Sequence, residues 1–139
     1  MPAVLHLFRA PKKRLPMEEL AEVQVVTDKG FEGCAHARPG SKRQILLVDC
    51  ETLEAMELRP GIIRENITTR GLNVNSLKAG EQLKIGEVRL EISMVCTPCD
   101  QLEKMRAGLR KEMWGRRGML CRVLEGGHIR RGDAIERLG

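Results

Sequence analysis

One thiol in this 139-residue chain, Cys99, occupies a position that favours reactivity, because it follows a strand-like run and begins a helix-like one. Thr97 is a favoured N-cap residue and Pro98 a favoured first helical residue, so the spacing predicts Cys99 at the second helical position. Backbone N–H groups there lack partners and lie at the positive end of the helix dipole, which lowers a cysteine pKa. The pattern predicts a reactive thiolate.

Cys96 and Cys99 also form a C-x-x-C pair, which together with Cys34 and His36 could supply four ligands to a structural zinc. Against this, the strand alternation over residues 87–94 extends to Cys96 and turns its side chain inward, whereas zinc ribbons carry their ligands on turns. The pattern favours Cys96 as a small buried side chain, as it does for Cys50 and Cys121 in their apolar segments, and keeps zinc as an alternative.

Basic loops offer an anion-binding site for this thiol to face. Residues 30–44 contain several glycines and His36, and Lys42 and Arg43 lie just before an apolar run. Glycine-rich backbone can turn N–H groups toward an anion, and Arg pairs with phosphate in bidentate fashion. Further basic segments lie at residues 64–71 and 114–118. We expect the segments to converge on one anionic ligand held against sulfur; the alternative is ordinary solvated surface.

Composition limits the class of protein. Twenty-four Lys and Arg against nineteen Asp and Glu give a net charge of +5, which suits an anionic partner. Two Phe and one Trp argue against a base-stacking surface for nucleic acid. The chain has no apolar run long enough to cross a bilayer and no secretory signal pattern, so we expect a cytoplasmic protein with reduced thiols and no membrane partner.

The hydrophobic pattern predicts a mainly β protein with a few short helices. Alternation over residues 87–94 indicates a half-buried strand, and the unbroken apolar run 45–48 indicates a strand covered on both faces. A short helix is expected at residues 50–58, and another after Cys99 with Leu102, Met105 and Leu109 on one face and Gly108 near its end. Further strands are expected at residues 3–8, 22–27, 65–69, 119–124 and 134–138.

These elements predict one α+β domain over residues 1–139, because no repeat or linker divides the chain. Residues 84–87 and 126–128 are typical of tight connections between antiparallel partners. Many short strands with few helices favour a closed or nearly closed barrel.

A series of spaced motifs runs along most of the chain: Gly30-x-x-Gly33-x-x-His36, Arg43-Gln44, Arg64-x-Asn66-x-Thr68-x-x-Gly71, Leu77-x-x-Gly80, Pro98-Cys99, Gly115-Arg116-x-Gly118 and Gly127-x-Ile129-x-x-Gly132-Asp133. In their order and spacing they resemble the MOSC domain, named after the C-terminal domain of molybdenum-cofactor sulfurases. The resemblance implies a mixed β-barrel. It also implies that the cysteine at the place of Cys99 carries a persulfide or ligates molybdenum.

The resemblance further implies a molybdenum cofactor (molybdopterin) as ligand, its anionic pterin part held by Arg43, Arg64, Asn66, Thr68, Arg116 and Arg117. Lys42 is added from its charge and position, and His36 from its glycine-rich motif. The chain lacks the pyridoxal-phosphate-dependent domain of the sulfurases, so no intrinsic pyridoxal phosphate is expected. The expected partner is a cysteine desulfurase or another cofactor-sulfurating enzyme.

The leading hypothesis is a sulfur carrier, or molybdenum-cofactor-binding protein, in which Cys99 accepts sulfane sulfur and delivers it to a metal-sulfur cofactor. One alternative is a small molybdoenzyme that reduces N-hydroxylated compounds, and another is a zinc-stabilised, non-catalytic binding module. Whether the protein is a sulfurtransferase, a reductase or no enzyme stays open. Cys34 stands where many relatives have Asp, so its thiol could serve as a second sulfur acceptor.

Overall fold

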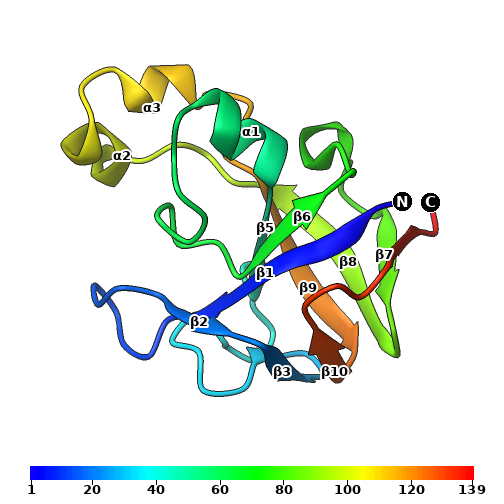
Figure 1. Ribbon diagram of the computed structural model, residues 1–139. Helices are drawn as coiled ribbons and strands as arrows, with labels where there is room; N and C mark the ends of the chain where they lie inside the picture. The colour runs from blue at the N-terminus through cyan, green and yellow to red at the C-terminus, as the bar shows by residue number, and fades with distance from the viewer.

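The computed structural model describes residues 1–139 and consists mainly of short strands (Figure 1). The strands are β1 (Ala3–Arg9), β2 (Glu18–Leu20), β3 (Glu22–Val26), β4 (Gly30–Phe31), β5 (Ile45–Asp49), β6 (Ile67–Arg70), β7 (Gln82–Ile85), β8 (Val88–Val95), β9 (Met119–Glu125), β10 (Gly127–Arg130) and β11 (Ile135–Arg137). The helices are α1 (Cys50–Ala55), α2 (Asp100–Met105) and α3 (Leu109–Glu112), with a 3-10 turn, η1, at Val74–Ser76. No helix is both long and apolar enough to cross a bilayer. The predicted mainly β class is confirmed.

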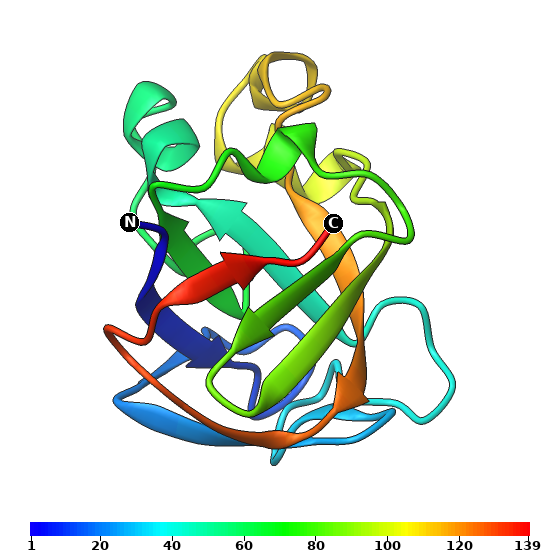
Figure 2. The same cartoon turned by 90° about the vertical axis from the view of Figure 1, so that its right-hand side faces the viewer.

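Eight strands form one curled sheet in the order β11-β7-β8-β9-β5-β6-β1-β2, in which β5 and β6 are parallel and the other neighbours antiparallel. The curl brings β1 back to the residues before β11, where Ala3 and Ala134 form an antiparallel bridge. The Val4 N–H donates to the Asp133 carbonyl at 2.8 Å beside this bridge. The sheet therefore forms the nearly closed barrel that the sequence predicted, with both chain ends on one side (Figure 2).

β5 separates two hydrophobic cores, as its unbroken apolar run predicted. Ile45 and Leu47 pack in the larger core inside the curled sheet, and Leu46 and Val48 pack in a smaller core against the helices. Successive strand residues point to opposite faces, so β5 must be apolar throughout to serve both cores. The helices thus lie on the outer face of the sheet, on the side where the site is found (Figure 1).

A second, three-stranded sheet, β10-β3-β4, lies across the lower end of the barrel in Figure 2. Its presence corrects the prediction of a tight turn at residues 126–128, because β10 pairs with β3 and not with β9. The Gly126 N–H donates to the Thr27 hydroxyl at 2.9 Å, and the Asp28 N–H donates to the Val123 carbonyl at 2.9 Å. These bonds hold the end of β3 next to β9. After Gly126 the chain therefore continues into β10, which pairs with β3, whereas the glycines had indicated a turn back to pair with β9.

The helical region after Cys99 also differs from the prediction. Cys99 is in an extended conformation and α2 begins at Asp100, so Cys99 is the N-cap and not the second helical residue. The expected single helix is interrupted: α2 ends at Met105, whose side chain is exposed, and α3 begins after Gly108. Gly108 has φ of +84°, a left-handed conformation that glycine adopts readily. Two short helices therefore replace one amphipathic helix.

Candidate functional site

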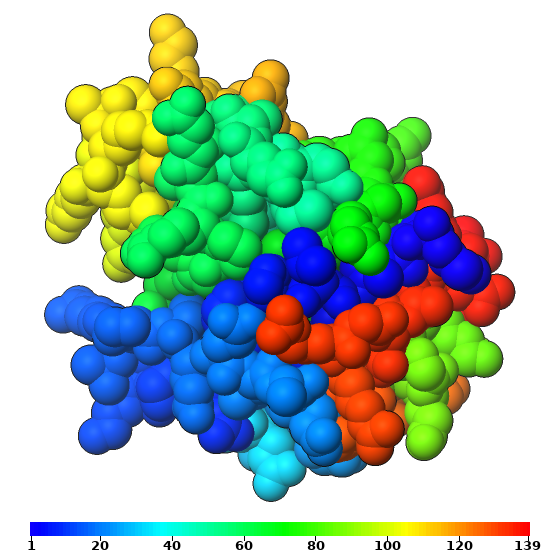
Figure 3. Space-filling model, viewed as in Figure 1, coloured from blue at the N-terminus to red at the C-terminus, as the bar shows by residue number.

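The three basic segments meet at one pocket of about 350 Å³, called the cationic pocket below. Its charged lining residues are Lys13, Arg38, Arg43, Arg64 and Arg117, and no carboxylate side chain lines it. The remaining lining residues are His36, Ser41, Asn66, Gln101, Ala35, Leu46, Cys96 and Leu120. Figure 3 shows the surface notched between the loop after β1, in blue, and the α2–α3 segment, in yellow. A hollow with this lining attracts anions.

Asn66 joins three parts of the chain behind the pocket. Its side chain is fully buried, and its carbonyl oxygen accepts the Leu46 N–H at 3.0 Å. Its amide nitrogen donates to the Phe8 carbonyl at 3.2 Å and to the Cys34 Sγ at 3.4 Å. Asn66 therefore fixes β1, β5 and the loop of residues 32–44 relative to one another, and its role seen in the structure is to hold the pocket wall.

Arg117 carries the clearest sign of a missing partner. Its side chain is only 8% exposed, and its Nη2 donates to the Ile63 carbonyl at 2.6 Å. Its Nε and Nη1 are buried without any hydrogen-bond partner. Cationic nitrogens buried without an acceptor cost free energy, so an anion in the pocket would stabilise this arrangement.

The backbone next to Arg117 is held by a close approach. Gly118 has φ of +107°, and a Cβ there would collide with the Leu47 carbonyl oxygen. The Gly118 carbonyl in turn accepts the Cys96 N–H at 3.0 Å. The glycine thus lets the 114–118 segment pass against β5, which brings the Arg117 side chain to the pocket.

Arg43 and Arg64 are positioned by their own loops. The Arg43 N–H donates to the Ser41 hydroxyl at 2.9 Å, a local turn just before β5. Arg64 has a left-handed backbone, with φ of +66°, and its Nη1 donates to the Leu15 carbonyl at 2.5 Å. Gln44 fixes the long loop further, because its amide nitrogen donates to the Asp28 carboxylate and the Arg38 carbonyl, both at 3.1 Å.

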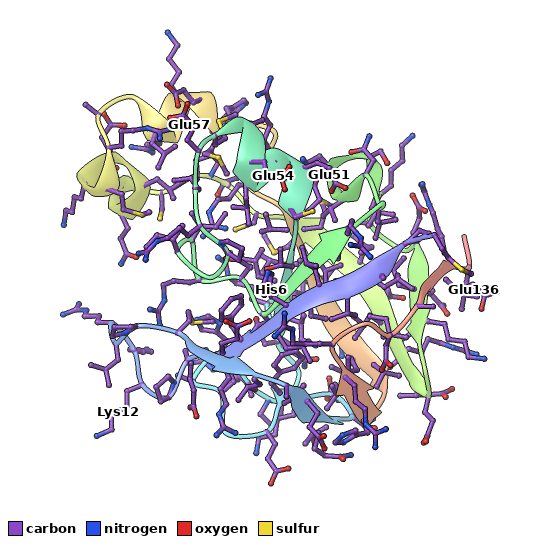
Figure 4. All side chains as sticks on the ribbon, viewed as in Figure 1. His6, Lys12, Glu51, Glu54, Glu57 and Glu136 are labelled. Atoms are coloured by element: carbon purple, nitrogen blue, oxygen red, sulfur yellow. The ribbon has the colours of Figure 1, made fainter.

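Three of the predicted cofactor-binding residues do not line the cationic pocket. Lys42 is exposed, and only its backbone carbonyl is engaged, by the Ser93 hydroxyl. Thr68 is buried and donates to the Glu65 carboxylate at 3.0 Å. Arg116 is exposed beside α1, in hollows shared with the carboxylates of Glu51 and Glu57. Figure 4 places Glu51 and Glu54 on α1 and Glu57 just after it, so Arg116 belongs to a region of mixed charge.

Cys99 is the exposed member of five free cysteines. It lies in the chain between Cys96 and Gln101, both of which line the pocket, although its own side chain does not. α2 has only six residues, and the Cys99 side chain makes no capping hydrogen bond. The sulfur is therefore free of protein partners and open to solvent next to a segment of the pocket wall.

Cys34 is a buried thiol with several donors. Its Sγ accepts the Ala10 N–H at 3.3 Å and the Asn66 amide at 3.4 Å. Burial raises the pKa of this thiol, but hydrogen bonding to the His36 side chain and the Ala10 N–H outweighs burial and lowers the pKa to about 7. At Cys50 burial also raises the pKa, but there the neighbouring carboxylates raise it further, to about 11. Among these buried thiols, Cys34 is held in a setting that favours thiolate.

The four candidate zinc ligands are not gathered into a site. No group of three or more His, Cys, Asp or Glu side chains in residues 1–139 could hold a metal ion. Cys96 is buried as the strand alternation predicted, while Cys34 hydrogen-bonds to Asn66. The zinc-stabilised module therefore has no support in the geometry.

Sequence reasoning missed Lys13, Arg38 and Cys96 as pocket residues. Lys13 lies in the basic run of residues 12–14 after β1, a charge pattern that could have been added to the three basic segments. Cys96 is both a core residue and a pocket residue, because it is buried and its side chain still lines the hollow. Only the tertiary structure could show that double role.

Comparisons with known proteins agree with this architecture. Residues 40–136 match the family model of the MOSC domain. Solved structures with the same fold include the YUAD protein from Bacillus subtilis (TM-score 0.83, 20% identity, covering 97% of this chain and 94% of that one). YiiM from Geobacillus stearothermophilus has a TM-score of 0.81 at 20% identity, covering 100% of this chain and 76% of that one. YiiM from Escherichia coli has a TM-score of 0.70 at 19% identity, covering 96% and 69%.

No curated protein matches the sequence significantly. The family model nevertheless spans most of the chain, from the loop before β5 to β11, and includes Arg43, Arg64, Asn66, Cys99 and Arg117. The solved structures share the curled sheet over nearly the whole chain. The chain therefore belongs to the MOSC domain family, whose name links it to the C-terminal domain of molybdenum-cofactor sulfurases.

Proposed function

We propose that the protein carries sulfane sulfur on Cys99 and delivers it to a molybdenum cofactor held in the cationic pocket. One observation carries the proposal: the exposed thiol lies on the same short segment as two residues that line a pocket of five cations and no carboxylates. Exposure lets a donor protein reach the sulfur, and the charge of the pocket retains an anionic acceptor beside it.

The pocket fits the anionic part of such a cofactor. Its volume of about 350 Å³ lies in the range of small-molecule sites. Arg43 and Arg64 line it, and Arg117 has two unpartnered nitrogens for phosphate oxygens. When bound, the cofactor supplies a high-valent molybdenum that accepts soft sulfur ligands. In that state the Arg side chains would hold the phosphate, and Cys99 would be the solvent-exposed thiol that this chain offers next to the pocket.

Sulfur loading on Cys99 follows ordinary persulfide exchange. The Cys99 thiolate attacks the outer sulfur of a persulfide on the donor enzyme, the donor S–S bond breaks, and the donor cysteine leaves as thiolate. The Cys99 sulfur then bears the transferred atom, with no net oxidation or reduction of the pair. The step needs an approach path for a protein donor, which the exposed position of Cys99 provides.

The test is incubation with a cysteine desulfurase and free cysteine, followed by intact-mass and peptide mass spectrometry. We expect one added sulfur atom on the Cys99 peptide, lost in Cys99→Ala and retained in Cys50→Ala, whose thiol is buried. An equal adduct in Cys99→Ala contradicts the carrier role. Molybdenum that co-purifies with the protein, together with reduction of N-hydroxylated compounds, would favour the reductase instead.

A further inference from the structure

We propose that Cys34 is a second sulfur-accepting thiol, which takes sulfane sulfur from a small anionic donor of the thiosulfate class bound in the cationic pocket. This goes beyond the proposed function, since it uses the pocket but neither Cys99 nor a donor protein. Two independent observations support the proposal: the surroundings of the Cys34 sulfur and the two guanidinium nitrogens of Arg117 that have no hydrogen-bond partner.

The Cys34 sulfur is one hydrogen bond away from the pocket lining. Asn66, whose amide donates to the sulfur at 3.4 Å, lines the pocket, and so does His36, whose side chain lowers the pKa of the same thiol. Cys34 itself retains 8% exposure. The thiol therefore lies against the wall of a charged hollow that a molecule of a few atoms could enter, while a donor protein could not reach it.

The setting of Cys34 prepares it to act as a nucleophile. The thiolate is the reactive form of cysteine, and donors from Ala10, Asn66 and His36 stabilise negative charge on sulfur. Buried thiols without such donors behave differently: burial alone raises the pKa of Cys121 well above its usual range. Of the buried cysteines, Cys34 thus combines donors to sulfur with a place beside the pocket.

Arg117 points to the ligand class. Its side chain is more than nine-tenths buried, it lines the same pocket, and its Nε and Nη1 have no acceptor. A sulfonate-type oxyanion offers several oxygens to such a guanidinium. With Lys13, Arg38, Arg43 and Arg64 also in the lining, a dianion would be favoured over a neutral molecule.

The transfer balances without an added oxidant or reductant. The Cys34 thiolate attacks the outer, sulfane sulfur of thiosulfate, and an S–S bond forms on Cys34. The S–S bond of thiosulfate breaks, and its electron pair leaves with sulfite. The products are a Cys34 persulfide anion and sulfite, a dianion that Arg117 would hold until it is released.

The test uses the full-length protein with Cys99→Ala, incubated with thiosulfate. We expect one added sulfur on the Cys34 peptide and an equal amount of sulfite released, both reduced to background when Cys34→Ser is added. Cys50→Ser in the same background serves as the matched control and should retain both signals. Arg117→Gln should slow sulfur addition and sulfite formation together, because it weakens thiosulfate binding, and should leave the alkylation rate of Cys34 unchanged, because the donors to the Cys34 sulfur stay in place.

Two further measurements keep the result decisive. If Cys34→Ser fails to fold, site-mapped alkylation of the Cys99→Ala protein with and without thiosulfate replaces it. Thiosulfate should then give an alkylated persulfide at Cys34 alone, one sulfur atom heavier than the alkylated thiol and removed by a thiol reductant. Absence of both sulfur addition and sulfite release in the folded Cys99→Ala protein overturns the proposal. Desulfurase-dependent loading of Cys99 in the unsubstituted chain is measured separately, so this outcome would leave the carrier function standing.

Discussion

Cys34 and Cys99 are two thiols of one small domain with opposite surroundings. Cys99 is exposed, has no capping hydrogen bond and lies at the start of a six-residue helix. Cys34 is buried, receives two N–H donors and bonds to Asn66, which lines the cationic pocket. Cys99 is therefore open to solvent but makes no capping hydrogen bond, whereas Cys34 has hydrogen-bond donors to its sulfur but is closed to large molecules.

Because of these opposite surroundings, the size of the sulfur donor can select between the two thiols. A donor protein needs an exposed acceptor, which only Cys99 offers. A small anion can enter the pocket whose lining is one hydrogen bond from Cys34. The following experiments alter one side of this comparison at a time.

Asn66→Ala should have the largest effect on stability and on the reactivity of Cys34, because it removes a hydrogen-bond donor to the Cys34 sulfur and two backbone contacts. The change leaves the buried Leu46 N–H and Phe8 carbonyl without their side-chain partner and takes one donor from the Cys34 sulfur. Unsatisfied buried groups cost about 1–3 kcal/mol each, so we expect a loss of about 3 kcal/mol in the free energy of unfolding in urea. Alkylation of Cys34 at neutral pH should slow as well, with the rate at Cys99 unchanged.

Thr68→Val is the matched control for this change. Thr68 lies two residues after Asn66, in β6, is equally buried, and bonds to Glu65 rather than to the Cys34 sulfur. We expect it to destabilise the fold but to leave the alkylation rate of Cys34 as it was. A similar slowing at Cys34 in both variants would mean that general loosening, and not the lost donor, controls its reactivity.

The free energy of unfolding should depend on pH through Cys34 and not through the other buried thiols. His36 and Ala10 lower its pKa to about 7 against the opposing effect of burial, from an ordinary value of 9.0. The unfolded chain therefore binds more protons between these values, and the free energy of unfolding rises with pH across that window. The contribution is complete above the unfolded pKa, is lost as pH falls through about 7, and amounts to about 2–3 kcal/mol.

Urea denaturation between about pH 6 and pH 9 checks this dependence. Cys34→Ser should remove the rise, and Cys50→Ser should keep it, because the pKa of the Cys50 thiol is raised to about 11 and lies outside the window. Parallel pH profiles for the unsubstituted chain and Cys34→Ser would show that the thiol is not ionised in the folded protein.

His36→Leu should change reactivity more than stability. Without the imidazole, the pKa of Cys34 moves back toward its ordinary value, and less thiolate is present at neutral pH. We expect alkylation of Cys34 to slow by about tenfold, since a more basic thiolate is also a better nucleophile and offsets part of the loss. His128→Leu, which removes an exposed imidazole paired with Glu22 at 2.8 Å, should leave the rate unchanged.

The sequence predicted most of the fold because the strongest signals are local. The alternation of β8, the unbroken apolar run of β5 and the burial of Cys96 each depend on residues within a few positions. The pairing of β10 with β3 depends on contacts about a hundred residues apart, and glycines at 126 and 127 could not indicate it.

The candidate site was predicted at the level of loops but not of single side chains. Arg43 and Arg117 line the pocket while their neighbours Lys42 and Arg116 do not. Both pairs lie in loops or turns, where neighbouring side chains point in different directions, so charge alone cannot show which member of a pair lines the pocket. The surroundings of Cys34 were equally out of reach, because its donors come from Ala10 and Asn66, 24 and 32 positions away.

Cys99→Ser should have the smallest effect and the opposite sign. Cys99 is the N-cap of α2 and makes no capping bond, whereas a serine hydroxyl at an N-cap accepts a free backbone N–H of the first turn. We expect the free energy of unfolding to increase by about 0.5–1 kcal/mol while sulfur uptake from a desulfurase disappears. Urea denaturation and mass spectrometry on the same sample measure both. A chain that gains stability when it loses this thiol retains cysteine there for its chemistry; equal or lower stability of the serine variant would instead indicate that the thiol supports the fold.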